Sequence, residues 1–302
     1  MLNTLNHIIE IWAEAPTEFW LLTITILSLC VGSFLNVVIY RIPKILEYQW
    51  SEECREICNI NSNINSENNV NNIQKISLSK PDSSCPNCNQ KIKFYENIPV
   101  LSYIFLGGKC SQCKQKISLR YPFVELLTAA LSLFCIYYFG VSSKGFASVV
   151  FIWFLIALTF IDFDTQLLPD NLTFPLLWLG LIVNLQNTFV PISDAVIGAI
   201  VGYLSLWLVF WIFKLLTGKE GMGYGDFKLL SALGAWLGWQ MILPIILMSS
   251  LVGAVVGISL IVMSKLGKDV PILFGPYLAG GGVLVLFFGD TILQIFIYKS
   301  II

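Results

Sequence analysis

The sequence is short of histidine, and this limits the chemistry it can support. Its 302 residues include one histidine, His7. A Ser-His-Asp or Cys-His site would have to use His7, and an H-E-x-x-H metallopeptidase motif needs two histidines. We expect His7 to be an ordinary surface residue. Any catalytic centre in this chain should therefore work without histidine.

Charge is also scarce. Charged residues make up 12% of the chain and hydrophobic residues 56%, and the mean hydropathy is +0.75. Soluble domains carry roughly 25% charged residues, because a globular surface must face water. A lipid bilayer removes that requirement. The composition therefore predicts an integral membrane protein, and the net charge of −1 argues against nucleic acid as a partner.

Long apolar runs alternate with short connections, which predicts an all-α polytopic membrane protein of about eight transmembrane helices. Segments of this kind can cross roughly 30 Å of hydrocarbon. The break near 239–244 is the weakest, and merging its two neighbours would give seven spans. The expected spans are 19–40, 122–140, 146–162, 172–190, 194–215, 227–240, 242–263 and 274–298.

A polar segment follows the first span and indicates the orientation. Residues 41–120 contain eleven of the 18 lysines and arginines. The positive-inside rule places this segment in the cytoplasm, with both chain ends outside. We divide the chain into a first span (1–43), a cytoplasmic domain (44–120) and a multi-helix transmembrane domain (121–302).

The first half of the cytoplasmic domain is rich in asparagine. Residues 59–72 contain eight asparagines. Such a tract cannot bury enough apolar area to fold. We interpret residues 44–83 as a largely disordered insert without catalytic groups, and we assign no role to Cys54 or Cys58.

The second half, residues 84–120, carries two C-x-x-C pairs, Cys85/Cys88 and Cys110/Cys113, separated by 21 residues. Four thiolates from two tight turns form a tetrahedral set that suits zinc. Two disulfides or free thiols are the alternatives, although a cytoplasmic location argues against disulfides. A closed four-thiolate site is structural, so we expect a small zinc module that holds this domain together.

Aspartates stand at two apolar-run ends. Asp162 directly follows one run, and Asp226 opens another within the sequence Gly223-Tyr224-Gly225-Asp226. Ionisable groups at membrane depth are costly and usually functional. Two carboxylates close together share one proton: the ionised member takes a proton from water while the protonated member donates to a peptide carbonyl. A catalytic pair that needs no histidine or metal is therefore one interpretation of these two aspartates.

Other interpretations of these acids stay open on the residues alone. Asp170 stands where a helix N-cap belongs, and Asp164 could be a loop residue at the interface. Asp162 and Asp226 could make structural polar contacts or form an ion pathway in a transporter or channel. A zinc-tethered assembly scaffold is a third possibility, in which both aspartates would be dispensable.

Several separate motifs, in order along most of the chain, resemble the type IV prepilin leader peptidases, which belong to the GxGD membrane aspartyl peptidases. The Asn-rich insert departs from the family pattern by lengthening the segment between Pro43 and Cys85. The motifs that carry the resemblance are 32–43, the two C-x-x-C pairs, 117–128, 161–170, 223–229 and 274–279.

The resemblance implies a bifunctional enzyme of the bacterial inner membrane. Such enzymes cleave the leader of type IV prepilins and of the pseudopilins of type II secretion at the cytoplasmic face, after a glycine. They then methylate the new N-terminal residue with S-adenosylmethionine. By resemblance, Asp162 and Asp226 form the catalytic pair and the cysteines hold structural Zn²⁺. A peptidase-only member is the alternative.

The methyl-donor site rests on the resemblance alone, because the chain has no G-x-G-x-x-G motif after a strand. Candidate residues near the zinc module are Gly108, Lys109, Arg120 and Glu125. Arg120 and Glu125 could instead be a snorkelling pair at the membrane edge.

Overall fold

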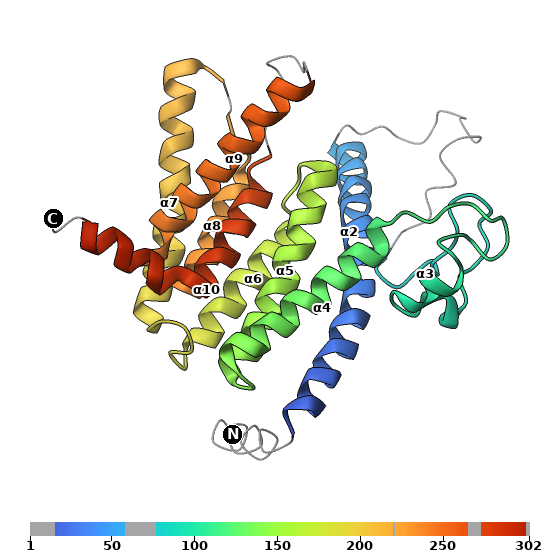
Figure 1. Ribbon diagram of the computed structural model, residues 1–302. Coiled ribbons are helices and arrows are strands. Elements are labelled where there is room, and N and C mark those ends of the chain that lie inside the picture. Colours follow the sequence, from blue (N-terminus) through green and yellow to red (C-terminus); the bar gives the residue numbers. More distant parts are fainter. Residues whose placement is uncertain (1–15, 58–76, 220, 265–272, 300–302) are drawn as a thin grey trace. The chain divides into compact units, whose positions relative to one another are not determined.

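A computed structural model describes residues 16–57, 77–219, 221–264 and 273–299 (Figure 1). The Asn-rich tract and Cys58 lie outside these ranges. Within them the chain is helical, and β-structure is limited to two isolated bridges. The long helices are α2 (Thr17–Ile57), α4 (Arg120–Phe139), α5 (Ser143–Thr165), α6 (Asp170–Asn184), α7 (Ile192–Thr217), α8 (Tyr224–Leu237), α9 (Ile242–Ser264) and α10 (Gly275–Lys299).

The all-α membrane class is confirmed, and each expected span corresponds to a helix. Among the described residues, six helices are long and apolar enough to cross a membrane: α2, α4, α5, α7, α10 and the segment Trp239–Val256 that contains most of α9. Helices α6 and α8 have 15 and 14 residues. At 1.5 Å per residue each is about 20 Å long, short of the roughly 30 Å of hydrocarbon.

The uncertain break after α8 is real. Helix α8 ends at Leu237, and Gly238 has φ +84°, a conformation that favours glycine. A short 3₁₀ turn, η2 (Trp239–Met241), then leads into α9. Two separate helices therefore form here, in place of the merged segment that would have given seven spans.

The described residues divide into two compact units. The amino-terminal unit comprises residues 23–130, and the helical unit comprises the described residues on either side of it. The helical unit is built around α8, which contacts α6, α7 and α10 (Figure 1). Eleven of the 14 residues of α8 are buried. A helix that is apolar all round is stable only inside a protein or a membrane, and α8 lies inside the protein.

Small residues let α7 approach α8 closely. Gly198 and Gly202 are four residues apart on α7, a spacing typical of tightly packed membrane helices. A methyl group on Gly202 would lie 2.6 Å from the carbonyl oxygen of Leu230, and Gly198 lies against the backbone of Gly234. Larger side chains at these positions would push α8 and its first-turn residues out of place.

The amino-terminal unit places α2 against the start of α4. The side chain of Asn36 donates to the backbone oxygen of Tyr121 at 3.1 Å, and Gly32 lies against the backbone of Glu125. Helix α2 continues to Ile57, fourteen residues beyond Pro43. The buried Arg41 donates to the carbonyl oxygens of Ser77, Leu78 and Pro81, at 2.9, 3.2 and 2.6 Å. Arg41 therefore fixes the segment that leads into the cysteine-bearing module.

Candidate functional site

Asp162 lies in the last turn of α5, before Gln166 ends the helix in the left-handed conformation. Its side chain is 5% exposed, and its Oδ2 atom has no hydrogen-bond partner among the described residues. The backbone amide of Gly275, at the start of α10, lies beside the carboxylate. A buried carboxylate oxygen without a partner is costly. Asp162 is therefore suited to hold a proton or to contact a ligand.

Asp226 lies in the first turn of α8, where its backbone N–H donates to the oxygen of Gly223 at 3.3 Å. Its side chain is 8% exposed, and the charge of Asp162 acts on it directly. The positive end of the α8 dipole also favours an ionised carboxylate at this position. The structure thus brings the two sequence-predicted aspartates together, from α5 and α8.

Leu168 and two glycines close the space around this pair. Leu168 lies in the loop between α5 and α6. A methyl group on Gly225 would lie 2.7 Å from Cβ of Leu168, and one on Gly275 would lie 2.5 Å from Oδ2 of Asp162 and 3.2 Å from Cδ1 of Leu168. Both glycines are therefore required by close packing. By contrast, a methyl group on Gly223 would meet only Oδ2 of Asp226, at 4.0 Å.

Asp170 has a different role from the expected N-cap. Pro169 occupies the N-cap of α6, and Asp170 is the first helical residue. Its carboxylate accepts two hydrogen bonds from Nζ of Lys228, at 2.6 and 2.8 Å. This ion pair joins the first turn of α6 to Lys228, the fifth residue of α8. Asp164 is an exposed residue near the end of α5.

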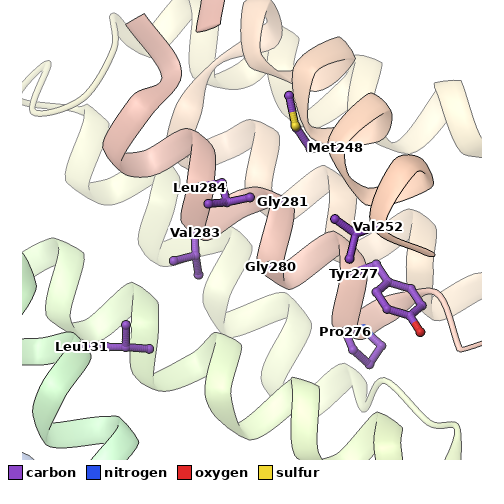
Figure 2. Close-up of a pocket in the computed structure, with 9 residues that line it drawn as sticks. All are labelled: Leu131, Met248, Val252, Pro276, Tyr277, Gly280, Gly281, Val283 and Leu284. Carbon is purple, nitrogen blue, oxygen red and sulfur yellow. The ribbon is translucent and has the colours of Figure 1, made fainter. Parts of the chain in front are cut away.

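An apolar groove begins next to Gly275, between α4, α9 and α10. Its volume is about 380 Å³, and Figure 2 shows Pro276 and Tyr277 at one end of it. The lining side chains are apolar apart from the tyrosine hydroxyl. An apolar helical segment suits such a groove better than a polar ligand does. The lining residues are Leu131, Met248, Val252, Pro276, Tyr277, Gly280, Gly281, Val283 and Leu284.

The four cysteines of the two C-x-x-C pairs form one cluster. Their sulfur atoms all lie within 4.8 Å of one another, and Sγ of Cys85 is 3.7 Å from Sγ of Cys113. A tetrahedral zinc with Zn–S bonds of about 2.3 Å needs sulfur atoms about 3.8 Å apart. The donor set and its spacing therefore fit zinc.

Two equivalent turns build this cluster. In the first, the N–H of Cys85 donates to the oxygen of Gln90 at 3.0 Å, and the N–H of Asn89 donates to the oxygen of Cys85 at 2.9 Å. In the second, Cys110, Lys114 and Gln115 repeat both bonds at 2.8 and 3.1 Å. Asn89 and Lys114 have matching φ values of 54° and 57°. This duplicated turn orients both cysteine pairs toward one point.

Hydrogen bonds in the turns favour the thiolate, the form that binds a metal, at two of the four cysteines. The backbone N–H of Gln115 and the side-chain amide of Asn87 lower the pKa of Cys113 to about 6. The backbone N–H groups of Cys88 and Asn87 lower the pKa of Cys85. Desolvation and the neighbouring thiols raise the pKa of Cys88 to about 11, so a bound metal would have to displace the proton of that thiol.

Replacing Cys88 with serine is expected to remove bound zinc and unfold the module around it. A structural zinc site supplies on the order of 10 kcal/mol of binding free energy, which the module would lose. Zinc content by atomic absorption and protease resistance of residues 84–120 measure the effect. Cys54→Ser is the matched control, because Cys54 is an exposed residue of α2 outside the cluster. Full zinc content in Cys88→Ser would contradict the four-cysteine site.

The methyl-donor candidates fall into two groups. Gly108, at φ +66°, lies against the ring of Tyr103, and Glu125 accepts a hydrogen bond from the N–H of Val100 at 2.8 Å. Both therefore brace the segment 98–106 from within the protein. Lys109 is exposed, and Arg120 begins α4. Lys109 and Arg120 thus fit a charged ligand better than Gly108 and Glu125 do.

Sequence reasoning missed two features of these sites. Gly275 belongs to the motif at residues 274–279, and nothing in its neighbours indicates that it reaches Asp162. The three bonds of Arg41 to backbone oxygens were also missed. In the second case the available signal was an arginine at the end of an apolar run, two residues before Pro43.

Comparisons with known proteins match both parts of the chain. The family model described as Bacterial Peptidase A24 N-terminal domain matches residues 26–139, and that of the Type IV leader peptidase family matches residues 149–258. No solved structure matches.

Curated relatives share about half of the residues. A prepilin leader peptidase/N-methyltransferase of Pseudomonas aeruginosa is 48% identical over 290 residues, covering 96% of this chain and 97% of the relative. Proteins with the same name from Aeromonas hydrophila and Legionella pneumophila are 53% and 44% identical. They cover 88% and 92% of this chain, and 89% and 95% of their own lengths.

Proposed function

We propose that this chain, which belongs to the type IV prepilin leader peptidase/N-methyltransferase family, cleaves prepilin leaders with Asp162 and Asp226 as its catalytic pair. The observation that carries this proposal is the meeting of two buried aspartates from α5 and α8, one of them with an unpartnered oxygen. Such a pair can activate water without histidine or a catalytic metal.

In the proposed reaction the two carboxylates share one proton. The ionised carboxylate takes a proton from a water molecule, whose oxygen attacks the carbonyl carbon of the scissile peptide. The protonated carboxylate donates its proton to the carbonyl oxygen. When the tetrahedral intermediate collapses, the C–N bond breaks, the leaving amine takes up a proton from the pair, and one hydroxyl of the intermediate returns its proton to the pair as the new carbonyl forms. The Gly275 amide beside Asp162 helps to fix the orientation of that carboxylate.

The substrate is a type IV prepilin or pseudopilin, and the reaction takes place at the cytoplasmic face of the bacterial inner membrane. The lysine-rich segment after α2 supports a cytoplasmic placement of this side. The groove that begins at Pro276 supports an apolar substrate helix beside the catalytic pair. With the helix held in the bilayer, its leader junction would lie at the interface where Asp162 and Asp226 stand.

The second activity is N-methylation of the new N-terminal residue, for which S-adenosylmethionine supplies the methyl group. We place its site in the amino-terminal unit. Lys109 and Arg120 would bind charged groups of the methyl donor, and Gly108 and Glu125 would hold the segment 98–106 in position. The zinc cluster keeps this module folded and takes no part in bond cleavage.

The test is the intact mass of a prepilin after incubation with the purified chain in liposomes. The proposed function predicts loss of the leader, followed by an increase of about 14 Da when S-adenosylmethionine is present. Leader loss without the later increase would identify a peptidase-only member. An unchanged substrate mass, with a folded and zinc-loaded chain, would contradict the proposal.

A further inference from the structure

The zinc module, defined as residues 84–120, exposes several large apolar side chains. Phe94 is 88% exposed, Phe105 is 84% exposed and Leu119 is 72% exposed. Isolated apolar residues on a surface are ordinary, but a group of large ones in so small a module marks an interaction surface.

The short helix α3 (Leu101–Phe105) divides the module into an inner and an outer side. Tyr103 faces inward: its ring packs on Gly108, and its hydroxyl donates to the oxygen of Ile117 at 3.3 Å. Leu101, Ile104 and Phe105 are all exposed and follow the i, i+3, i+4 spacing of one helix face. The outer face of α3 is therefore formed by these three apolar side chains.

The module is also basic. Residues 84–120 contain five lysines, one arginine and one glutamate, a net charge of 6 − 1 = +5. A zinc tetrathiolate adds −2, because Zn²⁺ carries +2 and four thiolates carry −4, so the loaded module keeps +3. Lys109, Lys114 and Lys116 are exposed. A basic surface with exposed aromatic and aliphatic side chains is typical of protein segments that bind an anionic membrane surface.

Both ends of the module are tied to membrane helices. Leu119 directly precedes α4, and Arg41 of α2 binds the backbone of residues 77–81, which lead into the module. Helices α2 and α4 are both long and apolar enough to span the bilayer. These two links keep the module close to the ends of two membrane-spanning helices, and therefore close to the lipid headgroups.

We propose that the outer face of the zinc module, formed by Phe94, Leu101, Ile104, Phe105 and Leu119, docks into the headgroup boundary of an anionic leaflet. The aromatic and aliphatic side chains enter the boundary between headgroups and acyl chains, while Lys114 and Lys116 bind lipid phosphates. This inference stands independently of the proposed catalytic function. A protein occupant would need acidic groups around an apolar centre to match the same lysines, whereas anionic lipid provides both features.

Depth-dependent fluorescence quenching of the full chain in vesicles tests the proposal. A fluorescent amino acid is introduced at Phe105 and, as the matched control, at the exposed Gln112 of the second cysteine turn. Vesicles contain phosphatidylcholine with or without phosphatidylglycerol. Nitroxide lipids report contact with the bilayer, and aqueous iodide reports contact with water. We expect several-fold stronger lipid quenching at Phe105 than at Gln112, and an increase at Phe105 when phosphatidylglycerol is added.

A second variant distinguishes loss of the apolar surface from loss of the folded module. With the label at Phe94, the double change Ile104→Ser/Phe105→Ser should weaken lipid quenching several-fold while the zinc content stays unchanged. Iodide quenching of Phe105 equal to that of Gln112 would overturn the proposal. Protection of Phe105 from both quenchers would also overturn it, because the face would then be covered by protein. Equal lipid quenching with and without phosphatidylglycerol would overturn the assignment of an anionic leaflet.

Discussion

Asp162→Asn and Asp226→Asn are each expected to reduce prepilin cleavage by about 10³-fold or more, within the 10²–10⁴ range of general acid–base catalysis. Asparagine can neither ionise nor hold the shared proton, so one substitution disables both roles of the pair. The two losses should be similar in size, and the double variant should be little worse than either single one, because residues that act as a unit are not additive.

Asp164→Asn is the matched control for this prediction. Asp164 lies two residues beyond Asp162 on the same helix but is exposed, whereas Asp162 is buried. We expect it to keep cleavage within a few-fold of wild type. Initial rates of leader loss, measured on chains with equal zinc content and equal thermal stability, give the comparison. Near wild-type cleavage by Asp162→Asn, with loss in Asp164→Asn, would transfer the catalytic role to Asp164.

Gly275→Ala is expected to reduce cleavage by about 10²-fold, since small misplacements of catalytic groups carry costs of this size. The added methyl group would lie 2.5 Å from Oδ2 of Asp162, so either the carboxylate or the start of α10 must move. Gly225→Ala should behave similarly, because its methyl group would lie 2.7 Å from Cβ of Leu168 and push the first turn of α8 away. Cleavage rates at saturating prepilin measure both effects.

Gly223 is the control for the same change. Gly223→Ala places its methyl group 4.0 Å from Oδ2 of Asp226, an ordinary van der Waals distance. We expect this variant to keep most of its activity. The two glycines of the Gly223-Tyr224-Gly225-Asp226 sequence should therefore differ sharply. Equal loss in Gly223→Ala and Gly225→Ala would show that backbone conformation, and not the space beside Leu168, explains the glycines.

The membrane class could be predicted from the sequence, because it depends on a local signal: apolar run lengths define the helices. The cysteine cluster could be predicted for a similar reason, since the short spacing within each C-x-x-C pair already meets the geometric requirement of a metal site. The pairing of Asp162 with Asp226 joins two helices far apart in the chain. An aspartate at the end of an apolar run is unusual, but the residues alone left several interpretations of it open, and the pairing was implied by the family resemblance.

The position of α8 could not be predicted from hydropathy. Its residues are as apolar as those of a lipid-facing helix, yet they are buried against α6, α7 and α10. The hydropathy of a segment indicates that its side chains avoid water, but it does not distinguish a helix surrounded by lipid from one surrounded by protein. The roles of Gly275 and Asp170 were hidden for a related reason. Each depends on a partner far away in the chain, Asp162 for the first and Lys228 for the second.

The burial of α8 supports the proposed catalytic pair. Asp226 stands on a helix enclosed by protein, so its carboxylate is held by packing on several sides and the Asp170–Lys228 pair fixes the same turn. Rigid support of this kind keeps two like-charged groups together despite their repulsion.

The pH dependence of cleavage tests the shared proton most directly. In the proposed mechanism the active form of the pair holds one proton, so acid should inactivate the enzyme by protonating both carboxylates, and alkali should inactivate it by ionising both. We therefore expect a bell-shaped profile for the cleavage rate of a prepilin by the wild-type chain in liposomes. A rate that rises with pH to a plateau, while the chain stays folded, would contradict the pair and indicate a single base.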